Sequence, residues 1–222
     1  MDAPTNALLI DGAQPLTLPD FERIRAEHFR PAMDRAMVLH RDEVAALVAQ
    51  PGAPDFDNTA AAFDRCGALL QRIEAVFHSL SASATSPALQ AVQREMAAPL
   101  AAHWIAVHQD AALFARFDVL LAGRLAAGLT PEQQRLVERQ HRDLVRAGAQ
   151  LPPAQRAEFA ALGGQLAELS TRFAQNVLHD EAAYTLPLPD EAAMAGLPDF
   201  LRAAARQAAT ERGGEVPVIT LS

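Results

Sequence analysis

The stretch from Asn58 to Leu80 reads NTAAAFDRCGALLQRIEAVFHSL and holds the clearest apolar pattern in the chain. Its large apolar residues recur at steps of three and four: Phe63, Cys66, Leu70, Ile73, Phe77 and Leu80. This spacing places them on one face of a helix and predicts an amphipathic helix packed against a core. Asp57 or Asn58 stands where a residue that caps the helix is expected.

The same periodicity predicts helices on both sides of this stretch. We expect helices over about 26–50, around 89–104, over about 113–121 with a stop at Gly128, from Thr130 to Gly148 with Thr130 as cap, and from about Pro153 onward. The last of these carries a near-heptad stripe: Phe159, Leu162, Leu166, Leu169, Phe173 and Val177. We interpret this stripe as core, with a groove for a partner helix as the alternative. Gly163 and Gly164 interrupt it, which predicts close approach of a second helix in an antiparallel hairpin.

The pattern changes after Glu181. Tyr184–Leu188 and Val216–Leu221 are typical of short strands, and helices are expected near 191–195 and over 199–212. The fold class is therefore predicted as all-α, with six to seven helices, a long helical hairpin and a short β segment near the C-terminus. We expect three parts: an extended arm over 1–20, a helical domain over 21–180, and the start of an α+β segment over 181–222. A terminal apolar strand is an exposed edge, so we expect the natural chain to continue.

Composition excludes several classes of function. The 222 residues carry a net charge of −8 and include no lysine, which argues against nucleic acid as a partner and excludes P-loop and Schiff-base lysines. Cys66 is the single cysteine, so no internal disulfide is expected. We find no signal peptide and no apolar run long enough to span a membrane. These features predict a cytoplasmic protein with no membrane partner.

The seven histidines do not form a recognisable zinc motif. His40 and Glu43 could share a metal, but an isolated pair of this kind is interpreted as a solvated helix face. His103 and His108 are five residues apart, which turns them about 140° from each other on a helix. The segment from His141 to Leu144 spells the start of a kinase catalytic loop, but it lies in a predicted helix and we interpret it as coincidence.

Other candidate residues have structural explanations. Cys66 lies in the apolar stripe and is expected to be a buried structural cysteine. Asp55 and Asp57 could pair as carboxylates, but a turn and a helix cap explain them. We therefore predict no catalytic, cofactor-binding or metal-ligating residue in this chain.

Several segments together resemble the N-terminal region of the M3 family of zinc peptidases. They are Leu18–Ile24 with Glu27–Phe29 and Pro31–Ala32, Pro54–Thr59, Gly67–Leu70, Leu113–Arg116, Arg135–Glu138, Arg146–Ala149, Phe173–Leu178, Ala195–Pro198 and Ile219–Leu221. Their order and spacing cover nearly the whole chain. The likeness is closest to the branch that removes C-terminal dipeptides, and the oligopeptidase A branch is next.

The resemblance implies an enzyme that binds one zinc through an H-E-x-x-H helix and a downstream glutamate, and cleaves short peptides in a deep channel between two helical halves. No H-E-x-x-H occurs between Met1 and Ser222. The resemblance thus implies that this chain forms a channel wall beside a C-terminal catalytic region, which would be its partner. Zinc is expected in the full-length enzyme only, and the 222-residue chain is expected to be inactive.

Two rival hypotheses stay open. The chain could be a free-standing helical module that binds a peptide or protein through the stripe from Phe159 to Val177, which would have to be exposed. It could also be a zinc-free regulatory homologue that binds peptides without cutting them.

Overall fold

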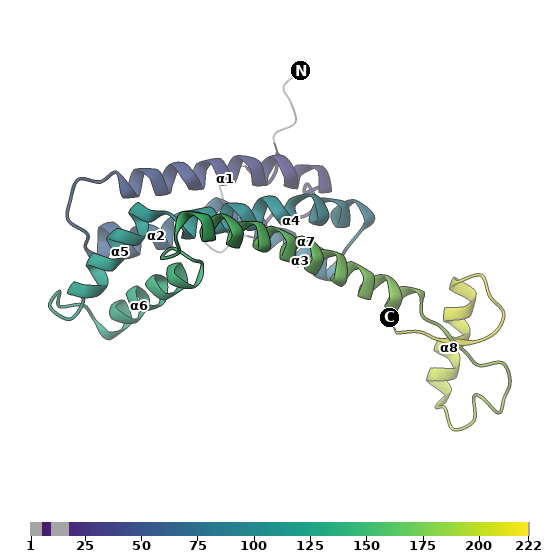
Figure 1. Ribbon diagram of the computed structural model, residues 1–222. Coiled ribbons are helices and arrows are strands. Elements are labelled where there is room, and N and C mark those ends of the chain that lie inside the picture. Colours follow the sequence, from purple (N-terminus) through teal and green to yellow (C-terminus); the bar gives the residue numbers. More distant parts are fainter. Residues whose placement is uncertain (1–5, 10–17, 222) are drawn as a thin grey trace, which may run out of the picture. The chain divides into compact units, whose positions relative to one another are not determined.

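The computed structural model describes residues 6–9 and 18–221, and helices dominate it (Figure 1). In chain order the elements are α1 (Ala26–Val48), the π-helical turn η1 (Phe56–Ala60), α2 (Ala61–Arg65), α3 (Ala68–Ser83), α4 (Pro87–His108), α5 (Ala111–Gly123), α6 (Pro131–Arg146), α7 (Pro153–Ala183), β1 (Leu186–Pro187), α8 (Asp199–Glu211) and β2 (Val218–Ile219). The predicted class, all-α with a short β segment near the C-terminus, is confirmed. The arm expected over 1–20 lies mostly outside the described residues.

The chain divides into two compact units between Leu169 and Ser170, a point inside α7. In the first unit, α1 packs against α3 and α4. Phe29 of α1 is fully buried and meets Phe77 of α3 with ring centroids 4.8 Å apart. Met96 of α4 joins the same apolar cluster. Burying large apolar side chains on both sides of α1 is the main force that holds these helices together.

A second cluster fills the other end of the first unit. The C-terminal turns of α1 meet α5 there, and α5 packs in turn against η1 and α6, around the buried side chains of Leu47, Phe117 and Leu144. Thr130 caps α6 as the sequence predicts, since its hydroxyl accepts a hydrogen bond from the Gln133 N–H at 3.2 Å.

The sequence predicts one continuous helix over Asn58–Leu80, and this prediction is wrong. The stretch begins as η1 and α2, breaks at Cys66 and Gly67, and resumes as α3. Gly67 has φ = +72°, a left-handed conformation, and a Cβ at this position would lie 2.8 Å from the His40 ring. Its N–H donates to Glu43 Oε2 at 2.7 Å. The break therefore lets the backbone of this turn lie directly on α1.

Local boundaries also differ from the prediction. Asp55 is the cap of the first turn, in place of Asp57 or Asn58, because its carboxylate accepts from the Asn58 N–H at 2.7 Å. The fourth predicted helix ends at Gly123, and a turn leads from there to Gly128.

Close approach of a second helix at the glycine pair is confirmed for Gly163. A Cβ built there would clash with Ile105 Cδ1 of α4. Nearer the start of α7, Arg156 reaches the carbonyl of Gln109 at 3.2 Å, so α7 runs antiparallel to α4 in this unit. In the chain, α4 is separated from α7 by α5 and α6. Gly164, by contrast, has no atom within 4 Å of a Cβ built on it.

The interpretation of the α7 stripe as core is wrong for this chain. Leu162, Leu166 and Leu169 are 58%, 66% and 52% exposed, and Phe173 is 71% exposed. The helix instead turns small residues, among them Ala160 and Gly163, toward α4. With about 100° of rotation per residue, Leu162, Leu166 and Leu169 lie on average about 120° around the helix from the midpoint of Ala160 and Gly163.

The second unit is a small module around α8. β1 pairs with β2 in antiparallel register, with Leu186 opposite Ile219. Leu188, Met194 and Ala205 are buried together beneath this pair. The short helix expected near 191–195 is wrong: residues 191–196 form turns that end at Gly196, which has φ = +81°.

Gly67→Ala should destabilise the first unit, because the new methyl group meets the His40 ring and the backbone is held at positive φ. Gly128→Ala is the matched control, with φ = +65° and no atom within 4 Å. We expect the control to lose about 1 kcal/mol from backbone strain alone, and Gly67→Ala to lose at least about 2 kcal/mol. Urea unfolding followed by circular dichroism measures both; equal losses would show that the contact with His40 is unimportant.

Candidate functional site

The most distinctive polar feature of the first unit is a buried pair of histidines. His40 of α1 is 1% exposed and His103 of α4 is 5% exposed. His40 Nδ1 and His103 Nε2 lie 3.0 Å apart, within hydrogen-bond distance. The pair joins two helices whose histidines are 63 residues apart in sequence.

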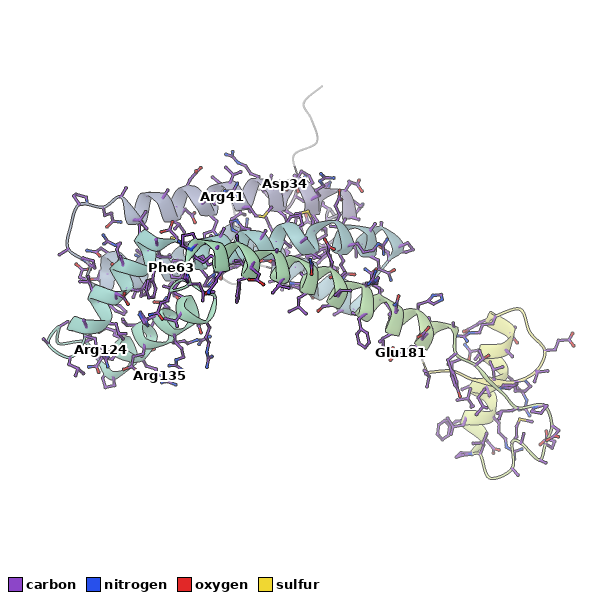
Figure 2. All side chains as sticks on the ribbon, in the orientation of Figure 1. Asp34, Arg41, Phe63, Arg124, Arg135 and Glu181 are labelled. Carbon is purple, nitrogen blue, oxygen red and sulfur yellow. The ribbon has the colours of Figure 1, made fainter. Side chains whose placement is uncertain are left out.

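The neighbouring arginine assigns the proton in this hydrogen bond. Figure 2 labels Arg41 on α1. Its Nη1 lies 3.4 Å from His103 Nδ1, and a guanidinium only donates. His103 Nδ1 is therefore the acceptor, so the neutral ring carries its proton on Nε2 and donates it to His40 Nδ1. A second proton on His103 would have to face Arg41.

An aromatic and acidic layer surrounds the pair. The Trp104 ring centroid lies 5.1 Å from that of His40, and its indole N–H donates to the Glu74 carboxylate at 3.2 Å. His108, one turn further along α4, bonds through Nδ1 to the Trp104 carbonyl at 2.8 Å. These contacts tie α1, α3 and α4 together through polar groups as well as apolar ones.

Burial sets the ionisation of these groups. It lowers the pKa of His103 to about 4, with further lowering from His40, Arg41 and His108. It also lowers the pKa of His40, against an opposing effect of Glu43. Burial raises the pKa of Glu74, although the Trp104 hydrogen bond partly offsets this. The histidine pair is thus neutral at pH 7.

The described side chains around the pair do not extend it into a metal site. Glu43, the second residue of the candidate metal pair, turns to the Gly67 N–H. Within residues 6–9 and 18–221, no three histidine, cysteine, aspartate or glutamate side chains converge on a position for a metal ion. The interpretation of His40 as part of a solvated face is wrong, because its ring is buried. The geometry makes the pair a polar clamp between helices.

The other candidate residues serve structural contacts. His141 lies in α6, where its Nε2 bonds Asp118 Oδ1 at 2.7 Å. Cys66 is buried, as expected, and its thiol donates to the Ala62 carbonyl at 3.3 Å. Burial, followed by the Glu43 charge, raises the pKa of this thiol, which disfavours the reactive thiolate. Asp57 does not pair with Asp55, whose carboxylate is engaged in the cap.

The sequence argument missed both the histidine clamp and the role of Arg116. His40 continues the apolar spacing of Phe29, Met33 and Ala36 on α1, so its burial could have been found from periodicity. Arg116 is nearly buried and its guanidinium donates to Asn58 Oδ1 at 2.6 Å. It thereby joins two of the segments that carry the family resemblance.

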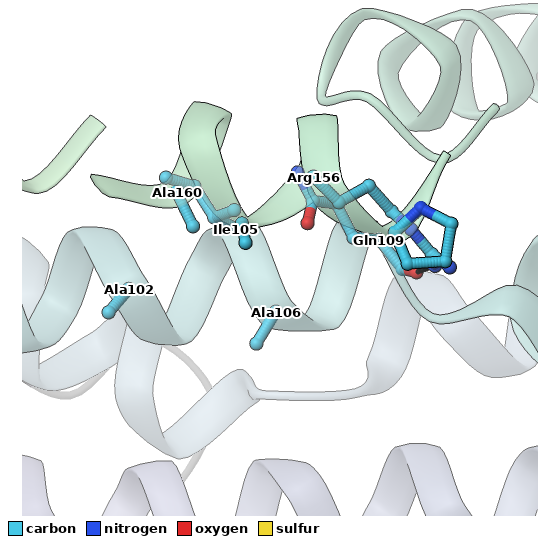
Figure 3. Close-up of a pocket in the computed structure, with 8 residues that line it drawn as sticks. Ala102, Ile105, Ala106, Gln109, Arg156 and Ala160 are labelled. Carbon is cyan, nitrogen blue, oxygen red and sulfur yellow. Dashed lines mark hydrogen bonds between the residues drawn. The ribbon is translucent and has the colours of Figure 1, made fainter. Parts of the chain in front are cut away.

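An open groove of about 380 Å³ lies between α4 and the start of α7. Figure 3 shows the residues that line it. Half of its lining residues are alanine, and the others are Ile105, Gln109, Pro153 and Arg156. Arg156 is engaged with the Gln109 carbonyl. The lining offers no nucleophile and no carboxylate pair, so the groove has the chemistry of a packing surface and not of a catalytic centre.

The geometry defines a class: a helical module whose helices are held together by a buried polar clamp as well as by apolar clusters. None of its described helices is long and apolar enough to cross a membrane. No family model matches the chain. It is, however, 38% identical over 211 residues to dipeptidyl carboxypeptidase of Salmonella typhimurium and 36% identical over 208 residues to that of Escherichia coli. It is 29% identical over 217 residues to oligopeptidase A of Escherichia coli.

These matches cover 94–98% of this chain but only 30–31% of the relatives. The chain thus spans about a third of their length. The chain is similar to the N-terminal region of M3-family peptidases, and the order of similarity, dipeptidyl carboxypeptidase before oligopeptidase A, is the one that the sequence segments predicted.

The histidine clamp predicts that stability falls in mild acid. Both histidines have a folded pKa below the unfolded value of 6.5, so the unfolded chain binds more protons as pH drops from about 6.5 toward 4. The shift of His103 corresponds to at most about 3 kcal/mol lost across this window. Glu74 acts with the opposite sign, since its folded pKa is raised.

His103→Gln should flatten this dependence when the free energy of unfolding is measured by urea titration from pH 4 to pH 7. His179→Gln, at an exposed position on α7, is the control and should keep the slope of the unchanged protein. A slope that persists in His103→Gln would assign the acid sensitivity to other groups.

Proposed function

We propose that this chain is the N-terminal helical part of a zinc-dependent oligopeptidase that removes C-terminal dipeptides from short peptides. One observation carries the proposal: identity with the two dipeptidyl carboxypeptidases is 36–38%, against 29% with oligopeptidase A of Escherichia coli, over nearly the same residues of this chain. The proposal places the longer protein in the cytoplasm.

In this proposal the chain contributes shape and not chemistry. The sequence has no H-E-x-x-H, and its described side chains do not converge on a metal position, so its residues do not fit a zinc site. The zinc would be held by a catalytic region beyond these residues. The helical unit would form one wall of a channel that admits short peptides and excludes folded proteins.

The histidine clamp supports a wall of this kind. A wall that selects substrates by size must keep its helices in place when a peptide enters. The hydrogen bond between His40 and His103, the Glu43 contact with Gly67 and the apolar core all hold α1 to its neighbours. Such combined polar and apolar packing favours a single rigid arrangement.

A free-standing binding module is the second candidate, and the exposed α7 stripe favours it. Leu166 is 66% and Phe173 71% exposed, which is the condition that this hypothesis requires. A helical face of this kind suits an amphipathic partner helix. The two candidates differ in whether a longer protein hydrolyses peptides.

Peptide hydrolysis tests the proposal. The 222-residue chain with added zinc should match the buffer blank, whereas the longer protein should release a dipeptide from a short peptide with an acetylated N-terminus and a free C-terminus. The matched control peptide carries a C-terminal amide and should resist, because its terminal carboxylate is missing.

Three results would contradict the proposal. Turnover by the 222-residue chain would place catalysis within it. Internal cuts in the amidated peptide would favour an activity of the oligopeptidase A kind. No hydrolysis by any longer product of the gene would leave the binding module as the function to test.

A further inference from the structure

Neither the proposed channel wall nor the histidine clamp explains why one side of α7 is apolar and exposed. Leu162, Leu166 and Leu169 follow one another at steps of four and three and are each more than half exposed. Phe173 and Val177 continue the spacing along the same helix in the second unit. Single exposed apolar residues are ordinary, but a row of large ones at helical spacing marks an interaction surface.

The charges on α7 reinforce this interpretation. Between Glu158 and His179, only Glu168 and Arg172 are charged. The segment from Phe159 to Ala167 has no charged residue, and Gln165 is its only polar side chain. Depletion of charge at the centre of a patch is typical of protein interfaces and not of a solvated helix face.

The contact with α4 does not account for the row. α4 meets the small-residue side of α7, where the Gly163 backbone lies against Ile105. The leucines point away from that side, so no rearrangement of the α4 contact alone would bury them. The helix therefore has two apolar sides, of which α4 covers one, while the other is exposed among the described residues of this unit.

We infer that the row Leu162, Leu166 and Leu169 is the surface on which the catalytic region of the longer protein packs against this helical unit. The inference rests on the proposed function, since it needs that longer protein. The relatives contain about two thirds of their length beyond the part that this chain matches. A segment tethered to the same chain is present at an effective concentration in the millimolar range, which favours it over a second copy or a free partner.

Thiol labelling tests this inference with little perturbation. Cys66, the single native cysteine, is buried and its pKa is raised, so it reacts slowly. Leu166→Cys introduces an exposed thiol in the row, and Val119→Cys introduces a matched control on α5, where the native side chain is 56% exposed. Both are made in the 222-residue chain and in the longer protein and are treated with iodoacetamide.

We expect the thiol at position 166 to react at least tenfold more slowly in the longer protein than in the 222-residue chain, and the thiol at position 119 to react at similar rates in both. Equal rates at position 166, in a longer protein that still releases dipeptides, would overturn the inference while leaving the proposed function intact. Equal slowing at both positions would show general shielding and would also overturn it. Slow, concentration-dependent labelling at position 166 in the 222-residue chain would identify a second copy as the occupant instead. If the longer protein does not hydrolyse peptides, the proposed function itself is contradicted.

Discussion

The arrangement of the first unit depends on the contact that two residues of α1 make with two different neighbours. His40 and Glu43 lie one helical turn apart. Glu43 accepts the N–H of Gly67, while the His40 ring both fills the space above that glycine and meets His103 of α4. Within one turn of its length, α1 is thereby held both to the turn before α3 and to α4. The apolar clusters on either side supply most of the stabilising free energy, and the polar contacts fix the register in which they pack.

This constraint explains where prediction from the sequence succeeded. α1 begins at Ala26 as expected, and α6 starts after the Thr130 cap, because the signals for both are local in the chain. Prediction failed at Gly67, where the apolar periodicity runs on through the break. At this position a side chain would meet the ring of His40, which is 27 residues away in sequence. A single helix across this point would have kept the spacing but could not have brought the backbone onto α1.

The site shows the same division between local and distant information. The position of His40 in an apolar row predicts that it is buried, and nothing in the row predicts that its partner is His103. The α7 stripe illustrates the converse: periodicity identifies an apolar face but does not identify what covers it. On α7 the small residues meet α4, and the large ones of the same helix stay exposed in the part of the chain that the structure describes.

The aromatic layer beside the clamp gives the protein an optical property of its own. Trp104 is the only tryptophan, and its indole lies between the histidine pair and Glu74. Excitation of indole at the red edge of its absorption therefore reports from one place, the meeting point of α1, α3 and α4. The second unit contains Tyr184 and no tryptophan, so it makes no contribution to that emission. Changes in the colour or intensity of the light would follow the packing of these three helices, free of interference from the rest of the chain.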